Sequence, residues 1–152
     1  MSIHQDKLQM LLSGEKTLEV RKTFPKVYRD GTDITTERVK LFVVFFYETI
    51  NEGGSGRIRA VGICDSRVVL TLQDDFRNWD DKNPGNLPKT ISQKAVDFCK
   101  ASKFSMEEIW AYARTKQYVF GWHFSNIIPM DQPVEKLGIE GNPQAWMKVR
   151  LR

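Results

Sequence analysis

Three charged residues near the start of the chain, Lys16, Glu19 and Arg21, have types and a spacing that could support chemistry. If residues 17–22 form a strand, side-chain alternation places Glu19 and Arg21 on one face and the apolar residues beside them on the other. The two cations offer donors to a phosphate or a base edge, and the carboxylate offers an acceptor or a general base. Spacing alone favours a solvated strand face with ion pairs, and leaves a polar pocket as the alternative.

Other residue types that commonly catalyse reactions are few and lack a recognisable spacing. Cys64 and Cys99 are far apart in the sequence, and His4 and His123 are the only histidines, so a zinc site would need almost all four to converge. The glycine cluster at 53–56 lacks the lysine and the helix signal of a phosphate-binding loop. We therefore expect no metal and no cofactor, and we expect neither histidine to be catalytic.

Basic residues repeat along two predicted strands. The chain carries a net charge of +4 at neutral pH, which tolerates a polyanionic partner without requiring one. Edge strands often carry such residues to prevent aggregation, and a row of them can equally contact the phosphates of a nucleic acid. These candidate contacts to a nucleic-acid backbone are Arg57, Arg59, Lys148, Arg150 and Arg152.

The composition is typical of a small globular domain. The chain has 152 residues, of which 41% are apolar and 28% charged, and this predicts a single domain over residues 1–152. The longest apolar run, 41–47, is far shorter than the roughly 20 residues of a membrane-spanning helix. No signal peptide is apparent, so we expect a cytoplasmic protein without a membrane partner. The oligomeric state does not follow from the sequence.

The periodicity of apolar residues predicts short helices and strands without a β-α-β rhythm. The fold class expected is α+β: a small, mainly antiparallel β-barrel with about three short flanking helices. A long loop is predicted at about 73–89, and a central strand over 39–47 should be covered on both faces. We expect helices over 5–13, over 91–99 and from 105 onward, and further strands over 17–22, 57–64, 68–72, 118–125 and 146–151.

Aromatic residues could be core residues or platforms for an unpaired base. The alternating aromatic residues of 118–124 are most simply explained as core. Trp146 is the better candidate for stacking, because it follows a turn and lies close to the amide side chain of Gln144.

Several segments, including Val61-Gly62 and 118–126, resemble the ASCH domain family, which is part of the PUA-like superfamily, and two others carry sequence motifs. The first begins with Ser2 and continues to the pattern Gly-x-Lys-x-x-Glu-x-Arg, which here runs from Gly14 to Arg21. The second is Pro-Gln-x-Trp, which here ends at Trp146. The resemblance implies a compact β-barrel with a cleft, in a superfamily that commonly binds RNA or modified nucleotides. The residues that it places around the cleft are Ser2, Lys16, Glu19, Arg21, Gln144 and Trp146.

Glu19 separates two functions that the resemblance implies. Small ASCH-like proteins that hydrolyse N4-acetylcytidine resemble this motif but use a threonine nucleophile where this chain has Glu19. The leading prediction is therefore a module that binds RNA or a nucleotide-like molecule, with regulation of RNA metabolism or translation as its expected role. The alternative is a hydrolase of a modified nucleoside or of RNA, with Lys16 and Glu19 as the proton-handling pair. A protein-interaction module is a third possibility, for which the sequence gives no positive signal.

Overall fold

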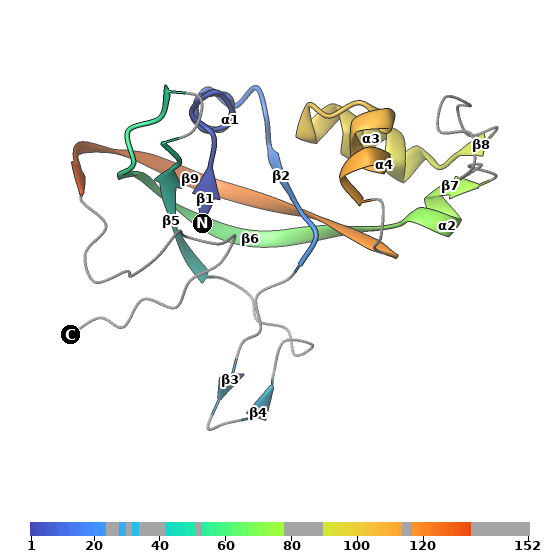
Figure 1. The fold of residues 1–152 in the computed structure, drawn as a ribbon. Helices are drawn as coiled ribbons and strands as arrows, with labels where there is room; N and C mark the ends of the chain where they lie inside the picture. Colours follow the sequence, from blue (N-terminus) through green and yellow to red (C-terminus); the bar gives the residue numbers. More distant parts are fainter. Residues whose placement is uncertain are drawn as a thin grey trace. The chain divides into compact units, whose positions relative to one another are not determined.

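The structure is a computed structural model that describes residues 1–23, 28–29, 32–33, 42–50, 53–77, 90–113 and 117–134 (Figure 1). These residues divide between two compact units. The first unit contains the described residues within 1–15, 25–66 and 124–152, and the second contains those within 16–24 and 67–123. The charged cluster predicted from the sequence belongs to the second unit.

Helices and strands alternate irregularly along the chain, and the α+β class is confirmed. Four helices lie in the described residues, one more than predicted. The elements are β1 (Ser2–Ile3), α1 (Gln5–Leu12), β2 (Leu18–Arg21), β3 (Tyr28–Arg29), β4 (Thr32–Asp33), β5 (Phe42–Glu48), β6 (Ile58–Thr71), α2 (Leu72–Asp75), β7 (Phe76–Arg77), β8 (Thr90–Ile91), α3 (Gln93–Ser102), α4 (Met106–Ala113) and β9 (Tyr118–Val134).

The main sheet is open, and the predicted closed barrel is wrong for the part of the chain that the structure describes. Its strand order is β1-β5-β6-β9-β2, with β1 parallel to β5 and the pairs β5–β6 and β2–β9 antiparallel. Closure would require the two edge strands to pair with each other, and β1 and β2 do not. The edge strands are short, with two residues in β1 and four in β2.

Three local predictions also need correction. The strand expected over 39–47 is β5, but Val43 and Phe45 are 60% and 39% exposed, so its outer face is not covered. The loop expected at 73–89 begins with α2 and β7, because Phe76 packs into the core and orders this stretch. One continuous strand, β6, replaces the two predicted over 57–64 and 68–72, since no glycine or proline interrupts the chain between them. The strand expected over 146–151 lies outside the described residues.

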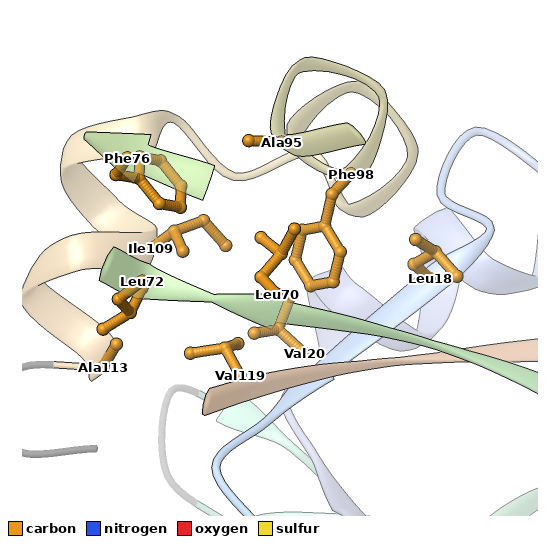
Figure 2. Close-up of a cluster of buried hydrophobic side chains, with 10 residues drawn as sticks. All are labelled: Leu18, Val20, Leu70, Leu72, Phe76, Ala95, Phe98, Ile109, Ala113 and Val119. Atoms are coloured by element: carbon orange, nitrogen blue, oxygen red, sulfur yellow. The ribbon is translucent and has the colours of Figure 1, made fainter. Parts of the chain in front are cut away.

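Apolar side chains from strands β2, β6, β7 and β9 and from helices α2, α3 and α4 form the core of the second unit (Figure 2). Leu18 and Val20 point into this cluster from β2, and Figure 2 shows Phe98 pointing from α3 toward Leu70 and Val20. Gly121 of β9 allows this close packing, because a Cβ atom there would lie 2.5 Å from the Phe98 ring. Since side chains alternate along a strand, burial of Leu18 and Val20 directs Glu19 to the opposite face of β2.

Asp75 joins the start of α3 to the end of β6. Its carboxylate accepts hydrogen bonds from the Thr71 amide at 2.8 Å, the Ser92 hydroxyl at 2.7 Å and the Lys94 ammonium at 3.3 Å. Ser92 in turn caps α3 by accepting the Ala95 amide at 3.1 Å. Burial by itself raises the pKa of Asp75, but the hydrogen bonds that its carboxylate accepts lower it more, so the pKa lies below the ordinary value of 3.8.

Replacing Asp75 with asparagine is expected to lower the free energy of unfolding by about 2 kcal/mol at neutral pH, because charge-assisted hydrogen bonds are lost. The folded pKa of Asp75 is depressed, so its stabilising contribution is present above the unfolded value and is lost as the pH falls through the folded one. Urea unfolding at a series of pH values should show the difference from wild type shrinking below about pH 4. Asp97→Asn, at an exposed position of α3, is the control. A difference that stays constant with pH would contradict this role of Asp75.

Candidate functional site

The charged cluster is positioned by β2 and by the end of α3. In the antiparallel pairing of β2 with β9, Glu19 lies opposite Trp122, which is fully buried. The amide of Thr17 donates to the Ala101 carbonyl at 2.9 Å, which ties the residues before β2 to α3. This bond fixes the chain beside Lys16, so the local sequence and one tertiary hydrogen bond together place the cluster.

Lys16, Glu19 and Arg21 form one ion cluster, which we call the charged triad. Lys16 Nζ lies 2.6 Å from Glu19 Oε2, and Arg21 Nη2 lies 2.9 Å from Glu19 Oε1. The side chains of Lys16 and Glu19 are 1% and 6% exposed, and that of Arg21 is 15% exposed. The structure thus brings together the three charged residues of the sequence motif, and it does so away from bulk water rather than on a solvated face.

The triad brings two cations and one carboxylate together in a buried place. The carboxylate of Glu19 lies between the ammonium of Lys16 and the guanidinium of Arg21. Taking charges out of water costs free energy, and a buried ion cluster is seldom the most stabilising way to fill a core. The arrangement therefore points to a role other than stability: Glu19 holds the partly exposed guanidinium of Arg21 in a fixed position.

Two aromatic rings lie beside the two lysines that flank β2. Lys16 Nζ lies 5.2 Å from the centre of the Phe104 ring, and Lys22 Nζ lies 4.7 Å from that of Tyr112. The centres of the two rings are 6.4 Å apart, with the ring planes at 55°. The sequence motif did not point to Phe104 or Tyr112. Helical spacing from the cap at Ser105 could have placed Tyr112 on α4, but its contact with Lys22 depends on how α4 packs beside β2.

His123 lies in a different place from the triad. It is half-buried and lines an open cavity of about 480 Å³ together with Leu18 and Phe98, on the side of β2 that faces α3. Glu19 lies on the other side of the strand. Burial raises the pKa of the Cys64 thiol to about 12 and also raises the pKa of Cys99, so neither is a thiolate at neutral pH.

The remaining predicted site residues lie in the first unit or outside the described residues. Ser2 is half-buried on β1, opposite Tyr47 of β5. Arg57 is exposed just before β6, and Arg59 is half-buried on it. No helix in the described part of the chain combines the length and the apolar character needed to cross a membrane. Outside the described residues lie Gln144, Trp146, Lys148, Arg150 and Arg152.

The fold resembles solved structures of an ASCH protein from Zymomonas mobilis. No model of a protein family matches the sequence, and no curated protein matches it. The structure of the Zymomonas mobilis protein superposes with a TM-score of 0.54 at 11% identity, covering 90% of this chain and 71% of that one. A variant of that protein with tyrosine changed to phenylalanine gives a TM-score of 0.54 at 10% identity, covering 90% and 73%. A variant with serine changed to alanine gives 0.55 at 11%, covering 89% and 71%. The predicted resemblance is thereby confirmed at the level of the fold, and the chain has the fold of an ASCH domain.

Proposed function

We propose that this chain is an ASCH-type module that binds RNA or a nucleotide, and that the charged triad forms part of the binding site. The observation that carries the proposal is the buried carboxylate of Glu19, which holds two cations, one of them the partly exposed guanidinium of Arg21. A phosphate group is the natural complement, because it is anionic and accepts several hydrogen bonds. The module is expected to act in the cytoplasm.

Arg21 is the member of the triad best suited to reach a ligand. Its side chain is more exposed than those of Lys16 and Glu19. A guanidinium has five N–H donors in a fixed plane, so it can contact a carboxylate and a phosphate at the same time. Glu19 would then hold Arg21 in position. The more deeply buried Lys16 would add to the positive electrostatic potential at the site.

The other predicted contacts remain part of the proposal. Ser2 and the segment around Gln144 and Trp146 would contribute further cleft residues. The basic residues would hold the phosphates of a longer strand, a contact that weakens as salt increases. These residues are Arg57, Arg59, Lys148, Arg150 and Arg152.

A hydrolase is the second candidate, and one distance favours it. Lys16 Nζ and Glu19 Oε2 are 2.6 Å apart, which is close enough for proton transfer. However, Arg21 occupies the other oxygen of Glu19, and protonating this carboxylate would weaken both ion pairs. We therefore favour binding. Turnover of N4-acetylcytidine or RNA by wild type, and its loss in Lys16→Met, would instead support the hydrolase.

Replacing Arg21 with glutamine is expected to weaken the binding of single-stranded RNA about tenfold, because one charge-assisted contact to a phosphate is lost. Fluorescence anisotropy of a labelled RNA of about ten nucleotides, at about 50 mM and about 200 mM salt, measures both the affinity and its salt dependence. The slope of log K against log salt should become shallower by about 0.7 for each phosphate contact removed. The variant leaves Lys16 and Glu19 as a neutral pair, so the folded structure should survive.

Lys100→Gln is the matched control for this experiment. Lys100 lies exposed on α3 and loses the same charge, so a comparable effect in both variants would indicate only a general loss of positive potential. If wild type binds neither RNA nor nucleotides at low salt, the proposed function is wrong, because phosphate contacts are strongest there.

A further inference from the structure

The row of side chains from Lys16 through Phe104 and Tyr112 to Lys22 connects the buried triad to the surface. Lys16 is buried, whereas Lys22, at the end of β2, is exposed. Phe104 and Tyr112 are both partly buried and pack against the core of the second unit. The ammonium of the exposed Lys22 lies over the face of the Tyr112 ring.

Phe104 gives Tyr112 a fixed support. The two ring centres are 6.4 Å apart at an interplanar angle of 55°, within the range in which aromatic pairs attract each other. Because Phe104 also packs against the core and contacts Lys16, it links the orientation of Tyr112 to the triad. A flat surface held in this way loses little conformational freedom when a ligand binds.

The contact between Lys22 and Tyr112 is one that a ligand could replace. A cation–π contact at an exposed site is weak, and a lysine side chain is long and flexible. Stacking of a nucleobase on an aromatic ring is stronger, and the displaced ammonium can move to the phosphate that belongs to the same nucleotide. The ring of Tyr112 therefore suits the base of a nucleotide, and the ammonium of Lys22 suits its phosphate.

We propose that Tyr112 is the platform on which a base of the bound RNA or nucleotide stacks, with Lys22 contacting the adjacent phosphate. This inference rests on the proposed function and adds the recognition of a base to that of phosphate. The ligand chemistry is a nucleobase joined to a phosphate, which either a single-stranded RNA or a free mononucleotide supplies.

The first test compares two labelled probes on wild-type protein: an oligouridine of about ten nucleotides and an oligonucleotide of the same length with abasic positions. Wild type should bind the base-bearing probe about tenfold more tightly, because only that probe can stack. Tyr112→Leu should remove this preference while the salt dependence stays unchanged. Tyr112→Phe, which retains the ring, should keep the preference.

Lys22→Gln provides the complementary variant. It should keep the preference for the base-bearing probe, while the slope of log K against log salt becomes shallower by about 0.7. Competition with uridine monophosphate separates the two sources of the ligand: full competition with the oligouridine indicates a mononucleotide site, and little competition indicates an RNA strand. Dependence on the ring of Tyr112 in either case supports the proposal.

Two results would overturn the inference while leaving the proposed function intact. The first is wild-type protein that binds both probes equally well. The second is Tyr112→Leu protein that is folded, as judged by thermal unfolding, and still prefers the base-bearing probe. Absence of binding to either probe at low salt would overturn the proposed function and this inference together.

Discussion

Replacing Glu19 with glutamine is expected to lower the free energy of unfolding by about 3 kcal/mol, because it leaves two buried cations without the carboxylate between them. Lys16 Nζ and Arg21 Nη2 contact different oxygens of Glu19, so one substitution weakens two ion pairs. The amide keeps the size of the side chain, and the effect therefore reports the charge. Urea unfolding at neutral pH measures it.

Glu15→Gln is the matched control, since Glu15 is exposed and precedes Lys16 in the chain. It should change stability by less than about 0.5 kcal/mol. Adding Lys16→Met to Glu19→Gln should cost less than the sum of the single changes, because the two residues contact each other. If Glu19→Gln is no more destabilising than Glu15→Gln, the triad is effectively solvated and does not hold Arg21 in the fixed position that the proposed site needs.

Replacing Phe98 with alanine is expected to lower the free energy of unfolding by about 4 kcal/mol, because it removes a buried ring and leaves a cavity. Phe98 is 1% exposed and packs on the backbone at Gly121 as well as on the side chains of the cluster (Figure 2). The surrounding strands cannot easily collapse into the space, since β2 and β9 are held in register by their hydrogen bonds. Urea unfolding of the variant checks the expected loss.

Val96→Ala controls for the change in side-chain size on the same helix. Val96 is 45% exposed, so its truncation should change the stability by less than about 0.5 kcal/mol. A similar loss in both variants would mean that the effect does not come from the buried ring, since alanine has the higher helix propensity and should not weaken α3. A large loss confined to Phe98→Ala would instead establish α3 as the element that holds β2, and with it the triad, in place.

Stability and ligand binding report different roles of the same triad. A purely structural ion cluster would make Glu19→Gln unstable and leave RNA binding by Arg21→Gln unchanged. A binding site would make Arg21→Gln weaker in binding while it stays folded. The pair of variants therefore separates the two roles, because Arg21 is the more exposed partner and its removal leaves a neutral ion pair.

Features that depend on neighbouring residues could be read from the sequence alone. The alternation of Leu18, Glu19 and Val20 predicted β2, and the structure confirms the strand. Gly14 follows the end of α1 with a φ of 76°, as expected for a residue after a helix C-terminus. Ser105 and Glu108 form the predicted capping box, in which the Ser105 amide donates to Glu108 Oε2 at 2.7 Å and the Glu108 amide to Ser105 Oγ at 3.2 Å. Local hydrogen bonds and side-chain periodicity determine each of these features.

The tertiary structure alone decided whether the charged motif is buried or solvated, and which rings lie beside it. Spacing favoured a solvated face for Glu19, yet its side chain is 6% exposed, because burial depends on residues far away in the sequence. The contact between Lys22 and Tyr112 joins residues that are ninety positions apart in the sequence, and no local sequence pattern predicts such a contact. For the same reason the open sheet was not foreseen: edge strands and central strands have similar sequences, and only pairing distinguishes them. The sequence thus determined the elements and the charged motif, whereas long-range packing decided the environment on which the chemistry of that motif depends.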